Sequence, residues 1–185
     1  MNLINIFKTD VGRVVLNENV KQLEKYALKL KQIEGRIKSN QGGFQSQDLP
    51  VVKETESLVM KITKAVNEYK DLFCIKRQLN LSNMWININS YKDGNILHNH
   101  PDSFISGVFY IKAFKNCGNI QFKQSSNIEY HIPENEIESH NPYNSCWWTL
   151  PVVTNTLFIF PSWLEHQVQP NLSKKDRISL SFNYT

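Results

Sequence analysis

The stretch NINSYKDGNILHNHPD, residues 87–102, combines turn-forming residues with three side chains that can bind a metal ion. His98, His100 and Asp102 occupy alternate positions, and an apolar run typical of a strand follows at 106–111. Successive side chains of an extended backbone point to opposite faces, so these three would share one face. Two of them, together with one distant histidine, would form a metal site.

The composition limits the class of protein. The chain has 185 residues, a length typical of one domain that buries its own core. No apolar run approaches membrane-spanning length, so no membrane partner is expected, and no basic leader with a long apolar core indicates a secretory signal. The three cysteines show no CxxC spacing, which fits a reducing, cytoplasmic location. The net charge of +4 comes with scattered lysines, which argues against a nucleic-acid partner.

The first 80 residues predict a helical scaffold. Apolar residues at three- and four-residue steps predict a helix within 20–37, capped by Asn17 or Asn19, and a second helix at 58–73. Between these helices, the polar stretch 39–48 contains Gly42-Gly43, which disfavours helix.

From residue 84 onward the sequence predicts short strands separated by turns. The predicted strands are 84–91, 105–113, 120–123, 149–153, 156–160, 166–168 and 177–183. The polar segment 124–146 reads as a functional or mobile insertion. We therefore predict a mainly β fold with N-terminal helices, a jelly roll buttressed by α-helices. It would be a single domain over 1–185, with a helical scaffold (1–80) and a jelly-roll core (84–185).

The distant histidine that the metal site needs is His166, in the strand-like sequence FPSWLEHQV, because His131 and His140 lie in the insertion. A His-x-Asp pair with a distant histidine is the facial triad of non-haem Fe(II) oxygenases. The triad leaves coordination positions open for a chelating cosubstrate and for O₂. The alternative is a His-Pro-Asp turn at the surface.

The last predicted strand, RISLSFN at 177–183, alternates strictly between polar and apolar residues. Arg177 shares a face with Ser179, Ser181 and Asn183. The planar guanidinium group binds a carboxylate with two hydrogen bonds, and small serines leave space beside it. This face therefore suits a dicarboxylic acid. The alternative is a half-solvated strand with an exposed arginine.

These motifs together resemble 2-oxoglutarate/Fe(II) dioxygenases of the AlkB and prolyl-hydroxylase types. The run from Asn89 to Asp102 resembles their N-x-Y-x-x-G…H-x-D signature, and His166 with the Arg177 strand resembles their distal histidine and arginine strand. More narrowly, HNHPDSFISGVFYI, FPSWLEHQVQPN and RISLSFN are similar to a family of 2-oxoglutarate oxygenases common in marine phages and bacteria. The resemblance covers roughly the second half of the chain. It implies that the fold is a double-stranded β-helix. If a phage encodes the protein, the expected location is the host cytoplasm.

Residue by residue, the resemblance implies His100 and His166 as Fe(II) ligands. The third ligand stays open between His98 and Asp102, because both would share a face with His100 in an extended strand. Arg177 would bind the distal carboxylate of 2-oxoglutarate. The further cosubstrate contacts that we expect are Asn89, Tyr91 and Ser179.

The activity that the resemblance implies is hydroxylation of an unidentified peptidyl or small-molecule substrate, with succinate and CO₂ as coproducts. Asn183 stands where AlkB-type proteins carry a second arginine, which counts against a role in nucleic-acid repair. Two other classes stay open: a non-catalytic jelly-roll binding module, and a cupin-type metal enzyme that uses three histidines without 2-oxoglutarate. The oligomeric state is open as well, a homodimer included.

Overall fold

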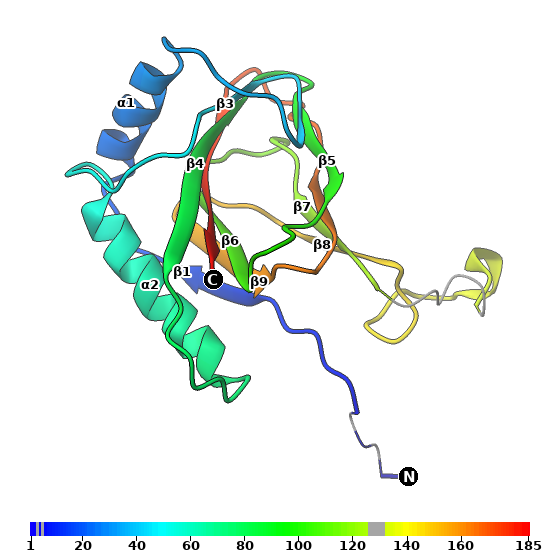
Figure 1. Cartoon of the computed structure of the whole chain (residues 1–185). Helices are drawn as coiled ribbons and strands as arrows, with labels where there is room; N and C mark the ends of the chain where they lie inside the picture. Colours follow the sequence, from blue (N-terminus) through cyan, green and yellow to red (C-terminus); the bar gives the residue numbers. More distant parts are fainter. Residues whose placement is uncertain (3, 5, 126–131) are drawn as a thin grey trace.

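The computed structural model describes residues 1, 2, 4, 6–125 and 132–185, and its described part contains two antiparallel sheets and two α-helices (Figure 1). The larger sheet has the order β1 (Gly12–Val15), β9 (Thr156–Pro161), β6 (Ile105–Lys112), β11 (Arg177–Tyr184), β4 (Leu81–Asn89), β3 (Phe44–Gln45). The smaller sheet has the order β2 (Asn40–Gln41), β5 (Gly94–His98), β10 (His166–Val168), β7 (Ile120–Lys123), β8 (Trp147–Leu150). This is the predicted double-stranded β-helix.

Both helices lie on the outer face of the larger sheet (Figure 1). Helix α1 (Val20–Leu30) begins at Asn19, whose side chain accepts a hydrogen bond from the Gln22 amide, and helix α2 is Glu56–Asp71. The first helix ends earlier than the apolar pattern predicts. The chain leaves it because Gly35 packs on the Gln45 carbonyl and the Arg36 amide donates to that same oxygen at 2.8 Å. Neither described helix has the length and apolar character that crossing a bilayer requires.

Side chains along the strands of the larger sheet point alternately to its two faces, and each face borders a separate apolar interior. One set of side chains packs against the helices, as Ile86, Phe109 and Leu180 do. The opposite set faces the smaller sheet, where Phe158 and Phe160 belong to a second apolar cluster. At one end of this second interior the apolar side chains give way to polar ones, and several candidate residues of the sequence analysis lie there: His98, His100, His166, Asn89, Arg177 and Ser179.

Four strands escaped prediction: β1, β2, β3 and β5. Strands β2 and β3 are two residues each, too short to show a period. They pair with different sheets, β2 with β5 and β3 with β4, so the segment between the two helices joins the sheets at one end. Within the predicted insertion, the described residues include a 3₁₀ turn at Glu134–Glu136, whereas 126–131, including His131, lie outside the described residues.

Candidate metal centre and adjoining cavity

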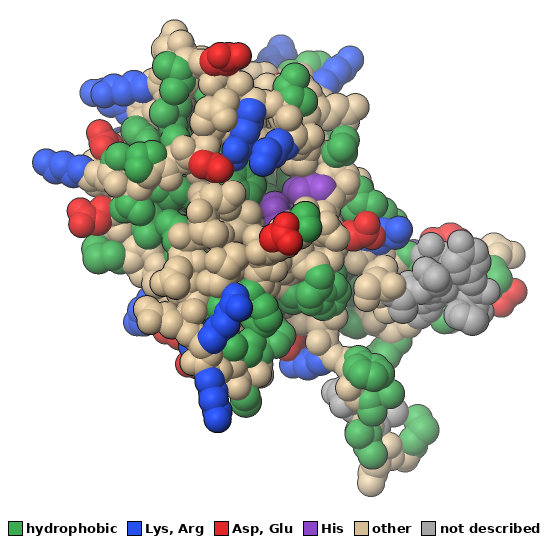
Figure 2. Space-filling view, viewed as in Figure 1, with side chains coloured by type: hydrophobic (Ala, Val, Ile, Leu, Met, Phe, Trp, Pro, Cys, Tyr) green, Lys and Arg blue, Asp and Glu red, His purple; other side chains and the backbone are tan. Residues whose placement is uncertain are grey.

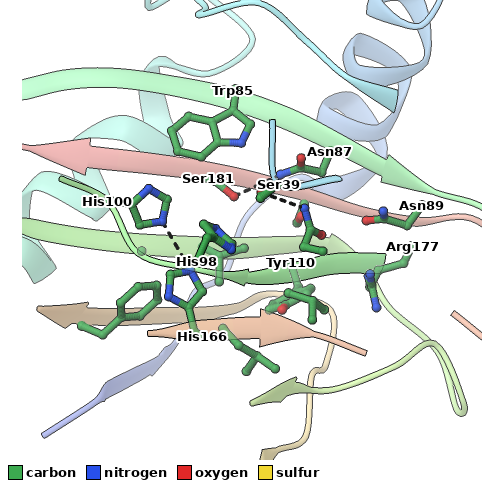
Figure 3. Close-up of a pocket in the computed structure, with 17 residues that line it drawn as sticks. Ser39, Trp85, Asn87, Asn89, His98, His100, Tyr110, His166, Arg177 and Ser181 are labelled. Atoms are coloured by element: carbon green, nitrogen blue, oxygen red, sulfur yellow. Dashed lines mark hydrogen bonds between the residues drawn. The ribbon is translucent and has the colours of Figure 1, made fainter. Parts of the chain in front are cut away.

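Three histidines meet where the smaller sheet faces the larger one (Figure 3). His98 is the last residue of β5, His100 follows two residues later, and His166 opens β10. The antiparallel pairing of β5 with β10 sets His166 opposite His98. One ring nitrogen from each of the three lies within 4.8 Å of the other two, so a single metal ion could contact all of them.

Hydrogen bonds to backbone carbonyls fix two of these rings. The Nδ1 atom of His166 donates to the Leu164 carbonyl at 2.9 Å, and that of His98 donates to the Ile96 carbonyl at 2.7 Å. A carbonyl oxygen only accepts, so the proton of each neutral ring is on Nδ1 and the Nε2 lone pair is free. The Nε2 atoms of His100 and His166 lie 3.3 Å apart, a distance that favours a cation or a proton between them.

Burial keeps these rings uncharged at neutral pH. It lowers the pKa of His100 to about 3, with the neighbouring His98 and Lys38 adding to the effect. Burial also lowers the pKa of His98, and it lowers that of His166 well below the ordinary histidine value. Neutral imidazoles offer lone pairs, and imidazole is a good ligand for iron, so the donor set fits Fe(II).

Asp102 does not join this cluster. The extended backbone that would place it beside His100 ends at His98, and Pro101 and Asp102 form a turn in which Asp102 has a φ of 65°. The His100 amide donates to the Ser162 carbonyl at 2.9 Å, which holds the chain as it turns away. Asp102 is therefore exposed, and the structure brings His98 to the other two histidines instead.

A narrow cavity of about 30 Å³ runs from the histidines between the sheets (Figure 3). Its far end is formed by the polar face of β11 and its neighbours, where Arg177 lies opposite Asn89 and Ser179 opposite both Asn87 and Tyr110. These five residues line the cavity together with the histidines. The sequence analysis named three of them, Asn89, Arg177 and Ser179.

Arg177 is only 1% exposed, and its Nη1 atom donates to the carbonyl of Cys117 and, at 3.0 Å, to that of Gln169. Its Nη2 atom has no partner in the described part of the chain, and neither have Tyr110 Oη, Asn89 Nδ2 and Asn87 Oδ1. Each buried polar atom left unpaired costs about 1–3 kcal/mol, so four along one cavity call for a ligand. Three of the four can donate a hydrogen bond and one belongs to a cation, which suits a carboxylate.

The structure adds Tyr110 to the expected residues and leaves Tyr91 out. Strand β4 ends at Asn89, and Tyr91 lies in the following turn, 57% exposed and away from the cavity. Tyr110 is fully buried on β6. Alternation along that strand puts Tyr110 on the face of Ser106 and Val108. The sequence held this signal, but only the pairing of β6 with β11 connects it to Arg177.

A second hollow, an open groove of about 620 Å³, borders the histidines from outside. The cavity and the groove share the side chains of Ser39, Trp85, His98 and His100. Figure 2 shows the histidines at the bottom of this hollow. Further residues come from the segment after α1, in which the sequence analysis named no site residue: Arg36, Lys38, Gln45 and Asp48.

Comparisons with known proteins identify the family and the fold of the chain. A family model described as "Putative 2OG-Fe(II) oxygenase" matches residues 83–183. Among solved structures, the α-ketoglutarate-dependent epimerase SnoN from nogalamycin biosynthesis has a TM-score of 0.70 at 14% identity, over 95% of this chain and 76% of that one. A Pseudomonas putida prolyl-4-hydroxylase has a TM-score of 0.63 at 11% identity, over 94% and 91%. HygX from Streptomyces hygroscopicus, with nickel and 2-oxoglutarate bound, has a TM-score of 0.65 at 12% identity, over 95% and 82%. No curated protein matches the chain.

Proposed function

The chain belongs to the 2OG-Fe(II) oxygenase family, and from this membership we propose that it hydroxylates a C–H bond of a peptidyl or small-molecule substrate. Its cofactors are Fe(II) and 2-oxoglutarate. One oxygen atom of O₂ would enter the substrate and the other would enter succinate, as 2-oxoglutarate loses CO₂. The observation that carries the proposal is the cavity. It has three neutral histidines at one end and, at the other, the buried Arg177, whose Nη2 atom has no hydrogen-bond partner in the described part of the chain.

The proposed iron ligands are His98, His100 and His166. The Leu164 and Ile96 carbonyls hold the rings of His166 and His98 in the tautomer that exposes Nε2. Bound Fe(II) with 2-oxoglutarate supplies the chemistry that activates O₂. Three protein ligands leave coordination positions for a chelating cosubstrate and for O₂, as the facial triads of such oxygenases do. In this proposal a histidine takes the position of the triad's carboxylate.

The proposed binding residue for the distal carboxylate of 2-oxoglutarate is Arg177. Tyr110 and Asn89 would donate further hydrogen bonds, and the small side chain of Ser179 would leave space for the cosubstrate. Because two backbone carbonyls already hold Nη1, the arginine loses little freedom when Nη2 binds a ligand. The cavity of about 30 Å³ is narrow for a five-carbon diacid. Entry therefore requires movement at the end that opens to the groove, beside Trp85 and His98.

An anaerobic titration tests the proposal: Fe(II) is added first, then 2-oxoglutarate, and the visible metal-to-ligand charge-transfer band is recorded. We expect the band in the parent protein, its loss in His98→Ala, and its retention in Asp102→Ala. Loss of the band in Asp102→Ala with retention in His98→Ala would assign the third ligand to Asp102. Iron binding without any band would favour the cupin-type enzyme, and no iron binding would favour the binding module.

Two expectations from the sequence stay predictions beside this proposal, a single domain over 1–185 and a cytoplasmic location, and the oligomeric state stays open, a homodimer included. Limited proteolysis tests the first, because a single cooperative domain resists cleavage between its helical and β parts. Localisation of the tagged full chain and light scattering during size-exclusion chromatography test the other two.

A further inference from the structure

The open groove lies where a primary substrate must lie if the proposed function holds. Because it shares Trp85, His98 and His100 with the cavity, a molecule in the groove borders the proposed metal centre. Its volume of about 620 Å³ is in the range of about 300–1,000 Å³ that small-molecule sites occupy. The charged groups of the groove therefore bear on which substrate it accepts.

One pair of charges belongs to the wall. Arg36 Nη2 donates to Asp48 Oδ1 at 2.6 Å, and the guanidinium group lies 5.7 Å from the centre of the Trp85 ring. The hydrogen bond from Arg36 is the main reason why the pKa of Asp48 is lowered. Arg36 and Asp48 thus form an ion pair, although the buried Arg36 Nε atom has no hydrogen-bond partner in the described part of the chain.

The other two charged residues, Lys38 and Asp102, have no ion-pair partner in the described part of the chain. Both are exposed. Lys38 lies close enough to His100 for its charge to act on that ring, and Asp102 follows His100 by two residues in a turn with positive φ. Figure 2 shows basic side chains on one side of the hollow and an acidic side chain on the other, with the histidines between. The groove is therefore dipolar, with no excess of either sign.

We infer that the groove binds a small zwitterion of the amino-acid type, with its carboxylate at Lys38 and its ammonium group at Asp102. A substrate with one charge would leave the other side of the groove uncompensated next to the metal centre. No ion pair joins Lys38 to Asp102 in the described part of the chain, so both charges are available to a ligand. A dipeptide spans roughly 7 Å when extended, so single amino acids and dipeptides are both suitable probes of this groove.

The test uses the full chain loaded anaerobically with Fe(II) and 2-oxoglutarate. Thermal-shift measurements with the twenty L-amino acids and their glycyl dipeptides identify the best probe. Calorimetry then compares that probe with its N-acetyl form, which lacks the ammonium group, and its carboxamide form, which lacks the carboxylate. We expect each blocked form to bind about tenfold more weakly or worse, as the loss of one charged hydrogen bond predicts.

Two variants assign the two contacts. In Lys38→Met the probe and its carboxamide should bind alike, and in Asp102→Asn the probe and its N-acetyl form should bind alike. Lys64→Met and Asp71→Asn on α2, outside the groove, should keep the parent's full discrimination.

The inference is overturned if no probe binds, if blocked forms bind as well as the parent probe, or if both groove variants discriminate as the parent does. The charge-transfer band keeps this failure separate from that of the proposed function. If the charge-transfer band forms but no zwitterion binds, only the proposed substrate class is wrong. If a zwitterion binds but no charge-transfer band forms, only the proposed oxygenase activity is wrong.

Discussion

At the scale of single residues, Tyr110 is the side chain that most sharply distinguishes the structure from the sequence motif. Its buried hydroxyl lies along the polar row that ends at Arg177 and has no partner among the described residues, whereas the motif residue Tyr91 lies at the surface. We predict that Tyr110→Phe raises the Kd for 2-oxoglutarate about tenfold to a hundredfold, the effect of losing a hydrogen bond to a charged group. Calorimetry on the metal-loaded protein measures it.

Tyr91→Phe is the matched control, because it removes the same hydroxyl from the residue that the motif implies, and its Kd should equal that of the parent. The reverse result, with Tyr91→Phe weakening binding and Tyr110→Phe neutral, would return the cosubstrate contact to the motif residue.

The sequence was informative about these residues to different degrees. Arg177, His100 and His166 stand in patterns whose chemistry can be stated without coordinates, namely a polar strand face and an isolated histidine next to a strand. The choice between His98 and Asp102 depended on where an extended backbone ends, and a short strand carries no local signal for its end. Predicting Tyr110 as a site residue requires knowing which distant strands pair, and the alternation within one strand does not give that information.

At the scale of elements, the turn after β6 holds the arginine. Gly118 has a φ of 80°, and a Cβ atom there would lie 2.2 Å from the Gln169 carbonyl oxygen and 2.7 Å from Arg177 Nη1. We predict that Gly118→Ala lowers the free energy of unfolding by about 1–3 kcal/mol and also weakens 2-oxoglutarate binding, because the turn must move away from Arg177. Urea unfolding and calorimetry measure the two effects.

Gly12→Ala in β1 is the comparison for this prediction. The nearest atom there is 3.2 Å away and belongs to a Tyr69 side chain, so a small change in stability and none in cosubstrate binding are expected. A Gly118→Ala protein that is destabilised but binds 2-oxoglutarate normally would show that the turn supports the fold without positioning the arginine.

The larger elements were predictable and the smallest were not. The seven predicted strands all exist, with ends displaced by a few residues, because each has enough residues to show alternation or an apolar run. Strands β2 and β3 lie in the polar stretch 39–48, for which the sequence predicted neither helix nor strand. Their conformation depends on pairing with β5 and β4, not on their own side chains.

At the scale of the whole molecule, the buried histidines make stability depend on pH. Burial lowers the pKa of His100 to about 3 in the folded protein, whereas an unfolded histidine titrates near 6.5, so between these values the unfolded chain binds more protons. The free energy of unfolding of the metal-free protein should therefore fall as the pH falls from 6.5. The loss is up to about 1.4 kcal/mol per pH unit for each such group.

Denaturant unfolding between pH 6.5 and 5, where most carboxylates stay ionised, measures this slope. His100→Asn should make it shallower, because the variant has one buried imidazole fewer. Equal slopes in the parent and in His100→Asn would contradict the prediction.

The segment that joins the two sheets has a consequence for how this enzyme can diversify. Residues 36–48 supply groove side chains from outside the region that the family model matches, which begins at residue 83. Part of the choice of molecule to oxidise, the part that depends on Lys38, would then be encoded outside the stretch that encodes the oxidative chemistry. Grafting this segment from one family member onto another should change the preference at the Lys38 side of the groove without rebuilding the reaction centre.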